Sequence, residues 1–207
     1  MAFRHIPVIS AGERALAAIL LLILLPLLFV VCLLALMLSR RSPLVAHRRV
    51  GKGGKPIWVY KVRTMWSGKN PPDTRFRFIE FLKGTEVPEC KCRVDPRVTS
   101  RVAVLWRRYS IDEMPQLWLV MTGEMSMVGP RPMTEGELVR HYGADSSRIL
   151  QAKPGLTGLW QIRGRSKLNY RQRRRLDLFM LKKWSLALYA AILFATVPKV
   201  FLGKDAW

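Results

Sequence analysis

The chain has 207 residues, with 35 Lys or Arg against 14 Asp or Glu, so its formal net charge is +21. This length allows one domain, or a small domain with a membrane anchor, and the charge favours phospholipid head groups, nucleotide diphosphates or nucleic acid as partners without separating them. The three cysteines indicate a reducing compartment: Cys90 and Cys92 are too close for an unstrained disulfide, and distant histidines argue against a zinc site.

The first expected element is an apolar helix. Ala15 to Leu38 carries no charge, which is enough helix to cross a bilayer at about 1.5 Å per residue, and it is too long for a cleaved signal peptide. Pro26 lies inside it and predicts either a re-entrant helix-break-helix or a kinked spanning helix. Arg14 and Arg40 flank the run on both sides, so the distribution of cations leaves both topologies open.

Two short β-rich stretches follow. Leu44 to Val50 and Ile57 to Val62 enclose a glycine-rich turn and predict a β-hairpin. Ser67 to Asp95 is rich in proline, glycine and charge and is interpreted as a surface insertion, with one short helix at Thr74 to Leu82. Arg97 to Arg108 has apolar residues at helical spacing, which predicts a helix with one cationic face.

Two adjacent carboxylates come next, Asp112 and Glu113, shortly after Arg108 and just before Pro115. Carboxylates are scarce in this chain, and such a pair beside cations can hold a divalent metal and attack a phosphate. The alternative is a helix start, where acidic residues satisfy free amides and complement the helix dipole. Pro115 to Met121 is predicted to be helical.

A proline-framed arginine occupies the next loop. Pro130 and Pro132 restrict the backbone around Arg131, which suits bidentate phosphate recognition. The alternative is a turn with a solvent-facing arginine.

A second turn-rich stretch runs from Lys153 to Arg165. Its glycines let the backbone approach a ligand closely. Trp160 and Arg163 can contact a nucleotide there, although a tryptophan in such a place is more often part of the core.

The last stretch, Leu168 to Leu202, passes from clustered arginines to aromatic and aliphatic residues. This pattern predicts a helix in the head-group plane, with its cations on lipid phosphates. A second spanning helix at Trp184 to Val197 is the alternative, but that run is short for a span.

Together these stretches resemble the bacterial sugar transferases of the monotopic phosphoglycosyl transferase superfamily. The motifs that carry the resemblance cover most of the chain: Ser42-Pro43-Leu44-Val45, Tyr60-Lys61-Val62-Arg63-Thr64-Met65, Asp95-Pro96-Arg97-Val98-Thr99, Arg108 to Leu117, Gly123 to Pro132, and Lys153 to Gly158. Two departures stand out: Leu25 replaces a serine common before Pro26, and Tyr189 stands where the last helix often carries aspartate.

The resemblance implies a mainly helical α+β fold that is monotopic in the membrane. Residues 1–41 would form the re-entrant helix, broken at Pro26. Residues 42–207 would form a cytoplasmic catalytic domain with a short β-hairpin, interfacial amphipathic helices and an insertion at about 67–95. The location implied is the cytoplasmic face of the bacterial inner membrane.

The resemblance also implies the chemistry: transfer of a sugar 1-phosphate from a UDP-sugar to a polyprenyl (undecaprenyl) phosphate, through a covalent phosphosugar-enzyme, with Mg²⁺ and release of UMP. Asp112 would be the nucleophile and Glu113 would position metal or substrate. The remaining site residues would bind substrate phosphates (Arg131, Lys61, Arg63 and Arg108) or form a nucleotide or substrate loop (Pro130, Pro132, Gln161 and Arg163).

The expected partners are thus a UDP-sugar, polyprenyl phosphate and membrane lipids, and not nucleic acid. A homodimer stays open, although no heptad pattern argues for one. The competing class is a non-enzymatic, membrane-anchored basic protein, for which charge matters and Asp112 does not. That class leaves the proline-framed Arg131 unexplained, and the chain has no recognisable nucleic-acid module.

Overall fold

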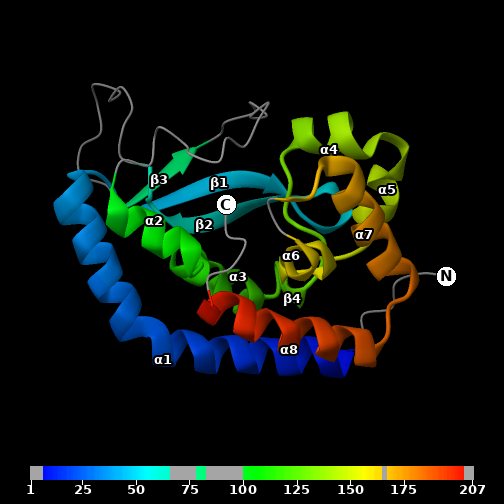
Figure 1. Ribbon diagram of the computed structural model, residues 1–207, viewed down its shortest axis with the longest axis horizontal. Coiled ribbons are helices and arrows are strands. Elements are labelled where there is room, and N and C mark those ends of the chain that lie inside the picture. The colour runs from blue at the N-terminus through cyan, green and yellow to red at the C-terminus, as the bar shows by residue number, and fades with distance from the viewer. Residues whose placement is uncertain (1–6, 66–77, 83–99, 165–166, 203–207) are drawn as a thin grey trace.

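The computed structural model describes residues 7–65, 78–82, 100–164 and 167–202. Helices dominate this part of the chain, which also forms a three-stranded sheet, β2-β1-β3, and a two-stranded one, β4-β5 (Figure 1). The predicted mainly helical α+β class is confirmed.

The elements in chain order are α1 (Pro7–Ser39), β1 (Leu44–Val50), η1 (Lys52–Gly54), β2 (Pro56–Val62), β3 (Ile79–Leu82), α2 (Arg101–Arg108), η2 (Ile111–Gln116), α3 (Leu117–Thr122), β4 (Ser126–Val128), α4 (Glu135–Tyr142), η3 (Gly143–Asp145), α5 (Ser146–Ile149), β5 (Gly155–Thr157), α6 (Leu159–Arg163), α7 (Tyr170–Lys182) and α8 (Leu186–Leu202), where η marks a 3₁₀ turn.

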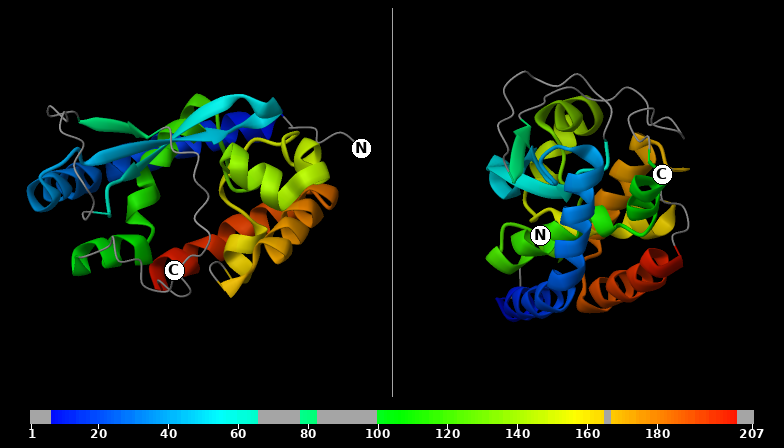
Figure 2. Two further views of the ribbon diagram at one scale, coloured as in Figure 1. Left: turned by 90° about the horizontal axis from the view of Figure 1, so that it is seen from above. Right: turned by 90° about the vertical axis from the view of Figure 1, so that its left-hand side faces the viewer.

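The elements form layers. Figure 1 shows the first half of α1 and α8 along the bottom of the molecule, the three-stranded sheet above them, and α4 and α5 at the top beside α7. In the right-hand view of Figure 2, the first half of α1 and α8 lie at one level on the two sides of this base. Large apolar side chains on both are exposed, among them Ile19, Leu22, Phe194 and Phe201. The base is therefore an apolar face.

Helix α1 is continuous from Pro7 to Ser39 with Pro26 inside it, and it bends part-way along (Figure 1). Within the described residues it alone is long and apolar enough to cross a membrane, judged by length and composition. Both halves join the core: Ala17 packs in one buried cluster, and Val31 and Ala35 in another. The predicted break is therefore a bend within one helix, and helix is maintained through the proline.

The predicted hairpin is confirmed. Strands β1 and β2 pair antiparallel from Leu44 opposite Val62 to Val50 opposite Pro56. The turn between them places Gly53 and Gly54 at φ +68° and +82°, a region that glycine adopts without steric cost. β-branched residues on alternate positions then bury one face of the hairpin.

The predicted helix at Thr74 to Leu82 is wrong over its second half. Ile79–Leu82 forms strand β3, which pairs parallel with β1 so that Leu44 lies opposite Ile79. Phe81 packs edge-to-face on Trp58 with ring centroids 4.9 Å apart, so pairing with a distant strand overrides local helical preference. Residues 74–77, like most of the insertion, lie outside the described residues.

Around the two carboxylates, the observed elements agree more closely with those predicted from the sequence. Helix α2 begins at Arg101, where the Ser100 hydroxyl accepts from Val102 N at 3.2 Å, and residues 97–99 of the predicted helix lie outside the described part. The 3₁₀ turn η2 carries Asp112 and Glu113 and continues into α3. The helix predicted from Pro115 to Met121 is thus confirmed, its first turn being 3₁₀.

The C-terminal predictions need two corrections. The stretch Lys153 to Arg165, expected to be turns, contains strand β5 and helix α6. The single helix expected over Leu168 to Leu202 is two helices, α7 and α8, because the chain leaves helical geometry between Lys182 and Leu186. A capping box of Asn169 and Gln172 fixes the start of α7, which the basic pattern alone did not reveal.

One buried carboxylate joins these elements. Glu13 of α1 is 6% exposed, and its Oε1 accepts hydrogen bonds from Ser126 Oγ at 2.5 Å, Met127 N at 3.1 Å and Tyr189 OH at 2.6 Å. These donors belong to β4 and α8, so a single oxygen links α1 to the strand before the Arg131 loop and to the last helix.

Replacing Glu13 with alanine should lower the melting temperature of the detergent-solubilised protein more than other single changes at the base. Three buried donors would lose their acceptor, and each unsatisfied group costs about 1–3 kcal/mol. Tyr189→Phe removes one donor and should cost less. The control is Glu124→Ala, because the exposed Glu124 accepts only a 3.5 Å contact from Thr122. Equal melting of Glu13→Ala and Glu124→Ala would contradict the assignment.

Candidate active site

Asp112 is almost fully buried, at 7% exposure, on the first turn after α2. The helix α2 ends just before it, at Arg108, and Ser110 adopts a left-handed conformation at φ +57° between the two turns. Glu113, the next residue, is partly exposed and donates its backbone amide to Ser110 O at 3.1 Å. The two carboxylates therefore sit in different environments, one dry and one at the surface.

Cations surround this pair. Lys61 of β2 places its Nζ 2.6 Å from Glu113 Oε1. Burial raises the pKa of Asp112 to about 6, Lys61 and Arg107 pull it down, and the charge of Glu113 pushes it up. Asp112 is thus largely ionised at neutral pH although it is buried. We call Asp112, Glu113, Lys61 and Arg107 the Asp112 cluster.

The arginine in this cluster is Arg107, which the sequence did not single out. Its charge lowers the pKa of Asp112, whereas the predicted Arg108 is exposed and lies over the Tyr109 ring at 6.0 Å. A helical-wheel argument would have found Arg107, since it follows the buried Ala103 by four residues and so shares its face. Phosphate binding by Arg108 remains a prediction.

Arg63, also predicted to bind phosphate, is buried and paired within the fold. Its Nε donates to Ser42 O at 2.7 Å, and its guanidinium forms an ion pair with Glu80 of β3. These contacts join the end of the hairpin to the insertion. The structure therefore brings Lys61 to the carboxylates and gives Arg63 contacts elsewhere.

The Asp112 cluster contains two carboxylates, which are oxygen donors of the kind that Mg²⁺ binds. No group of three or more His, Cys, Asp or Glu side chains gathers within the described part of the chain, so the protein offers two carboxylates, Asp112 and Glu113. Mg²⁺ is commonly held by one or two carboxylates together with substrate phosphates and water. These two residues fit that mode of binding.

The predicted Arg131 loop is held by a close crossing of two backbones. Gly129 N donates to Thr157 O at 2.9 Å, and Gly155 N donates to Pro130 O at 2.8 Å. A Cβ on Gly155 would lie 2.1 Å from Gly129 N, so no side chain fits there. Pro130 is buried and Pro132 half-buried, and the loop that carries Arg131 is consequently fixed at both ends.

Arg131 belongs to a second group of charges. Its guanidinium carbon lies 5.8 Å from the centroid of Trp160, and that of Arg173 lies 4.7 Å from the same ring. Arg49 pairs with Glu137 at 2.8 Å. Trp160 is buried, so it is a core residue that also contacts two arginines. We call the group Arg49, Arg131, Arg173, Glu137, Asp177 and Trp160 the Arg131 cluster.

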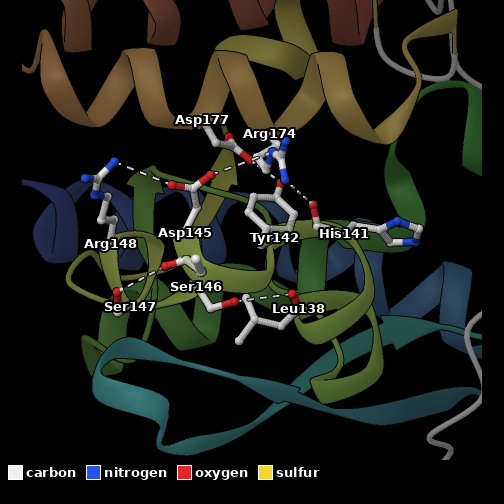
Figure 3. A network of polar contacts seen from close by, with 10 residues as sticks. Leu138, His141, Tyr142, Asp145, Ser146, Ser147, Arg148, Arg174 and Asp177 are labelled. Carbon is white, nitrogen blue, oxygen red and sulfur yellow. Dashed lines mark hydrogen bonds and ion pairs between the residues drawn. The ribbon is translucent and has the colours of Figure 1, made fainter.

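Asp177 of α7 is the buried acid of this cluster. Figure 3 shows it reaching from α7 toward Tyr142, whose OH donates to Asp177 Oδ2 at 2.8 Å. Burial raises the pKa of Asp177 to about 7, although the hydrogen bond from Tyr142 and the charges of Arg131 and Arg173 lower it. The neighbouring Arg174 donates to His141 O at 3.2 Å and lies 3.8 Å from Asp145, which fixes α7 against α4 and η3.

The other two residues predicted for the nucleotide loop lie on α6. Gln161 follows Trp160 and is half-buried, close enough to Gly158 that a Cβ there would meet its Oε1 at 2.7 Å. Arg163 is exposed at the end of the helix. The predicted residues therefore separate into the Asp112 cluster, the Arg131 cluster with Gln161, and the outlying Arg63, Arg108 and Arg163.

The profile of the bacterial sugar transferases matches residues 8–203, which include both clusters. The chain belongs to the bacterial sugar transferase family. The resemblance inferred from the motifs is thereby confirmed, and it disfavours the competing class of a non-enzymatic basic protein.

Three curated members of the bacterial sugar transferase family illustrate the similarity. The chain is 40% identical over 178 residues to the UDP-galactose-lipid carrier transferase of Erwinia amylovora, covering 84% of this chain and 37% of that protein. It is 38% identical over 196 residues to the exopolysaccharide production protein ExoY of Rhizobium meliloti, covering 92% and 84%. It is 34% identical over 216 residues to the UDP-glucose:undecaprenyl-phosphate glucose-1-phosphate transferase of Escherichia coli, covering 95% and 41%. The chain thus spans well under half of two relatives and most of the third.

Gly155→Ala should destabilise the protein and reduce its sugar transferase activity. The new methyl group would collide with the Gly129 backbone and push the Arg131 loop away, and such overpacking costs about 1–3 kcal/mol. Gly12→Ala is the matched control, because nothing lies within 4 Å of its Cβ position. A Gly155→Ala protein with the melting temperature and activity of Gly12→Ala would contradict the close crossing.

Proposed function

We propose that this protein transfers a sugar 1-phosphate from a UDP-sugar to a polyprenyl phosphate, as an early membrane step of glycan assembly. The observation that carries the proposal is Asp112, a buried carboxylate that stays ionised near neutral pH beside Lys61 and Arg107. A desolvated carboxylate is a stronger nucleophile than a solvated one, and the cations offset the charge of an incoming diphosphate. The printed name of the Escherichia coli relative describes a reaction of this type for that protein.

In the first step, an Asp112 carboxylate oxygen attacks the β-phosphorus of the UDP-sugar. The new bond joins this oxygen to the phosphorus, and the phosphoanhydride bond breaks so that its electrons leave with UMP. Lys61, held 2.6 Å from Glu113, is placed to neutralise charge on the phosphoryl oxygens. Glu113 orients Lys61 and substrate and abstracts no proton, because an ionised aspartate has none to lose.

In the second step, an oxygen of the polyprenyl phosphate attacks the same phosphorus and releases Asp112, giving a polyprenyl diphosphate sugar. This acceptor is already anionic at neutral pH, so the step needs little help from a base. Asp112 and Glu113 are the residues that would hold Mg²⁺, which when bound supplies charge neutralisation at the phosphates.

We propose further that α1 is re-entrant and that the enzyme lies on the cytoplasmic face of the inner membrane. Core residues occur on both sides of Pro26: Ala17 before it, and Val31 and Ala35 after it. Both halves of the helix thus pack on one globular body, an arrangement that a helix leaving on the far side of the bilayer cannot make. The exposed Leu22 and Phe29 near the bend would enter the acyl region.

The reaction is tested with full-length protein in nanodiscs containing undecaprenyl phosphate and Mg²⁺, supplied with a panel of UDP-sugars. Wild type should release UMP with at least one sugar, and Asp112→Asn should release it at least about a thousandfold more slowly, because the amide is not a nucleophile. Mass spectrometry of the protein incubated without acceptor should show a phosphosugar on the peptide that contains Asp112.

Asp145→Asn is the matched control, since it removes a carboxylate of η3 that pairs with Arg148 of α5 and Arg174 of α7. It should retain activity. Unchanged UMP release by Asp112→Asn would remove this residue from the mechanism. UMP release by wild type without any phosphosugar adduct on the protein would remove the covalent step.

The pH dependence provides a separate test of the nucleophile. The kcat/KM of wild type should fall about tenfold per pH unit below about pH 6, because a protonated Asp112 cannot attack. Lys61→Gln removes a cation that lowers the pKa of Asp112, so the acid limb should move to higher pH. A limb that stays in place or moves to lower pH in Lys61→Gln would contradict the assignment of this limb to Asp112.

A further inference from the structure

One face of the hairpin runs from the Asp112 cluster to the Arg131 cluster, and His47 lies on it between them. Residues opposite each other in an antiparallel pair, and residues two apart on one strand, point to the same side of a sheet. His47 of β1 lies opposite Val59, which is two residues before Lys61 on β2. Arg49 follows His47 by two residues on β1, about 7 Å along the strand. Arg49, His47 and Lys61 therefore share one face.

The imidazole of His47 is neutral although cations lie near it. Burial lowers the pKa of His47 to about 4, and the charges of Arg49, Lys61 and Arg63 act in the same direction. A neutral imidazole carries one N–H donor and one nitrogen acceptor. A hydroxyl group, which also donates and accepts, is the natural partner for such a ring.

The fold leaves this ring available. His47 is half-buried, and no side chain or backbone group within the described residues forms a hydrogen bond or an ion pair with its imidazole. Polar groups that are withdrawn from water usually have a partner. An imidazole that the protein itself does not use is therefore free to bind a ligand on the shared face of the hairpin.

The position of Lys61 indicates which part of the donor meets His47. In the proposed reaction, Lys61 neutralises charge on the phosphoryl group that Asp112 attacks. The sugar is bonded to that same phosphorus through a single oxygen, so its hydroxyl groups lie within a few bond lengths of Lys61. Cations bind the phosphates, whereas discrimination between sugars needs a donor and an acceptor matched to a particular hydroxyl.

We propose that His47 is a specificity-determining residue, whose imidazole hydrogen-bonds a hydroxyl group of the sugar while the sugar 1-phosphate is transferred. The inference rests on the proposed function and deepens it, because it assigns the choice of sugar to a residue outside the Asp112 cluster. The contact is kept in the phosphosugar-enzyme, since the sugar remains when UMP leaves.

The test compares kcat/KM values of full-length protein in nanodiscs with undecaprenyl phosphate and Mg²⁺. The donors are UDP-glucose, UDP-galactose and their N-acetylamino counterparts, which differ from one another at single ring positions. His47→Ala should lower kcat/KM at least about fivefold for the sugar that wild type prefers, because a bound hydroxyl loses its partner. The value for a sugar that lacks this hydroxyl should fall less, so the preference narrows.

Arg48→Ala is the matched control on the same strand. Arg48 points to the opposite face of β1 and is exposed, with its guanidinium 3.9 Å from Glu135. This variant should keep the sugar preference of wild type. The melting temperature of His47→Ala should also match that of wild type, because the described part of the chain makes no hydrogen bond to the ring.

A second measurement separates the sugar from the ribose, which also carries hydroxyl groups. The phosphosugar-enzyme formed without acceptor is freed of UMP and then mixed with undecaprenyl phosphate. His47→Ala should slow this transfer several-fold, because the sugar is still bound to the protein. A residue that held the ribose would leave the rate unchanged, since the nucleotide has already left.

Two further variants keep the outcome decisive. His47→Leu removes both polar atoms but fills a similar volume, so it decides the matter if His47→Ala does not fold. His47→Gln keeps a donor and an acceptor and should recover part of the lost kcat/KM. Wild-type sugar preference in both His47→Ala and His47→Leu, or an effect confined to the first step, would overturn the assignment. Absence of transfer by wild type with every UDP-sugar would instead overturn the proposed function.

Discussion

The fold depends on one carboxylate oxygen buried where the long apolar helix α1 meets the rest of the chain. Glu13 accepts from Ser126, Met127 and Tyr189, and an acceptor in so dry a place holds its donors strongly because leaving them unpaired is costly. Ser126 N also donates to Pro154 O at 2.9 Å. The same contact therefore orders α1, the β4-β5 pair and α8, and with them the loop that carries Arg131.

The Asp112 cluster and the Arg131 cluster balance their buried charges in different ways. The Asp112 cluster keeps a buried acid ionised by placing Lys61 and Arg107 beside it. The Arg131 cluster holds three guanidiniums, those of Arg49, Arg131 and Arg173, and two carboxylates, those of Glu137 and Asp177, beside the buried Trp160.

The sequence predicted what is local and missed what is assembled from distant segments. The hairpin, the helix after Pro115 and the carboxylate pair with Lys61 follow from period, turn residues and motif order. Strand β3 was mistaken for helix because its partner, β1, is remote in sequence, and β4 and β5 are too short to show a period. Packing alone brings four further residues to their places: Glu13, Arg107, Arg173 and Asp177. Of these, only Arg107 could have been predicted from the sequence, by its position on the buried face of α2.

The participation of α1 in two core clusters means that this segment is not a tether. A tether can be exchanged for another anchor or cut away without loss of the domain it carries. Here Ala17, Val31 and Ala35 are interior residues, so α1 completes the core of the rest of the chain. Removing α1 would open both of these core clusters, and this apolar helix is therefore an integral part of the domain.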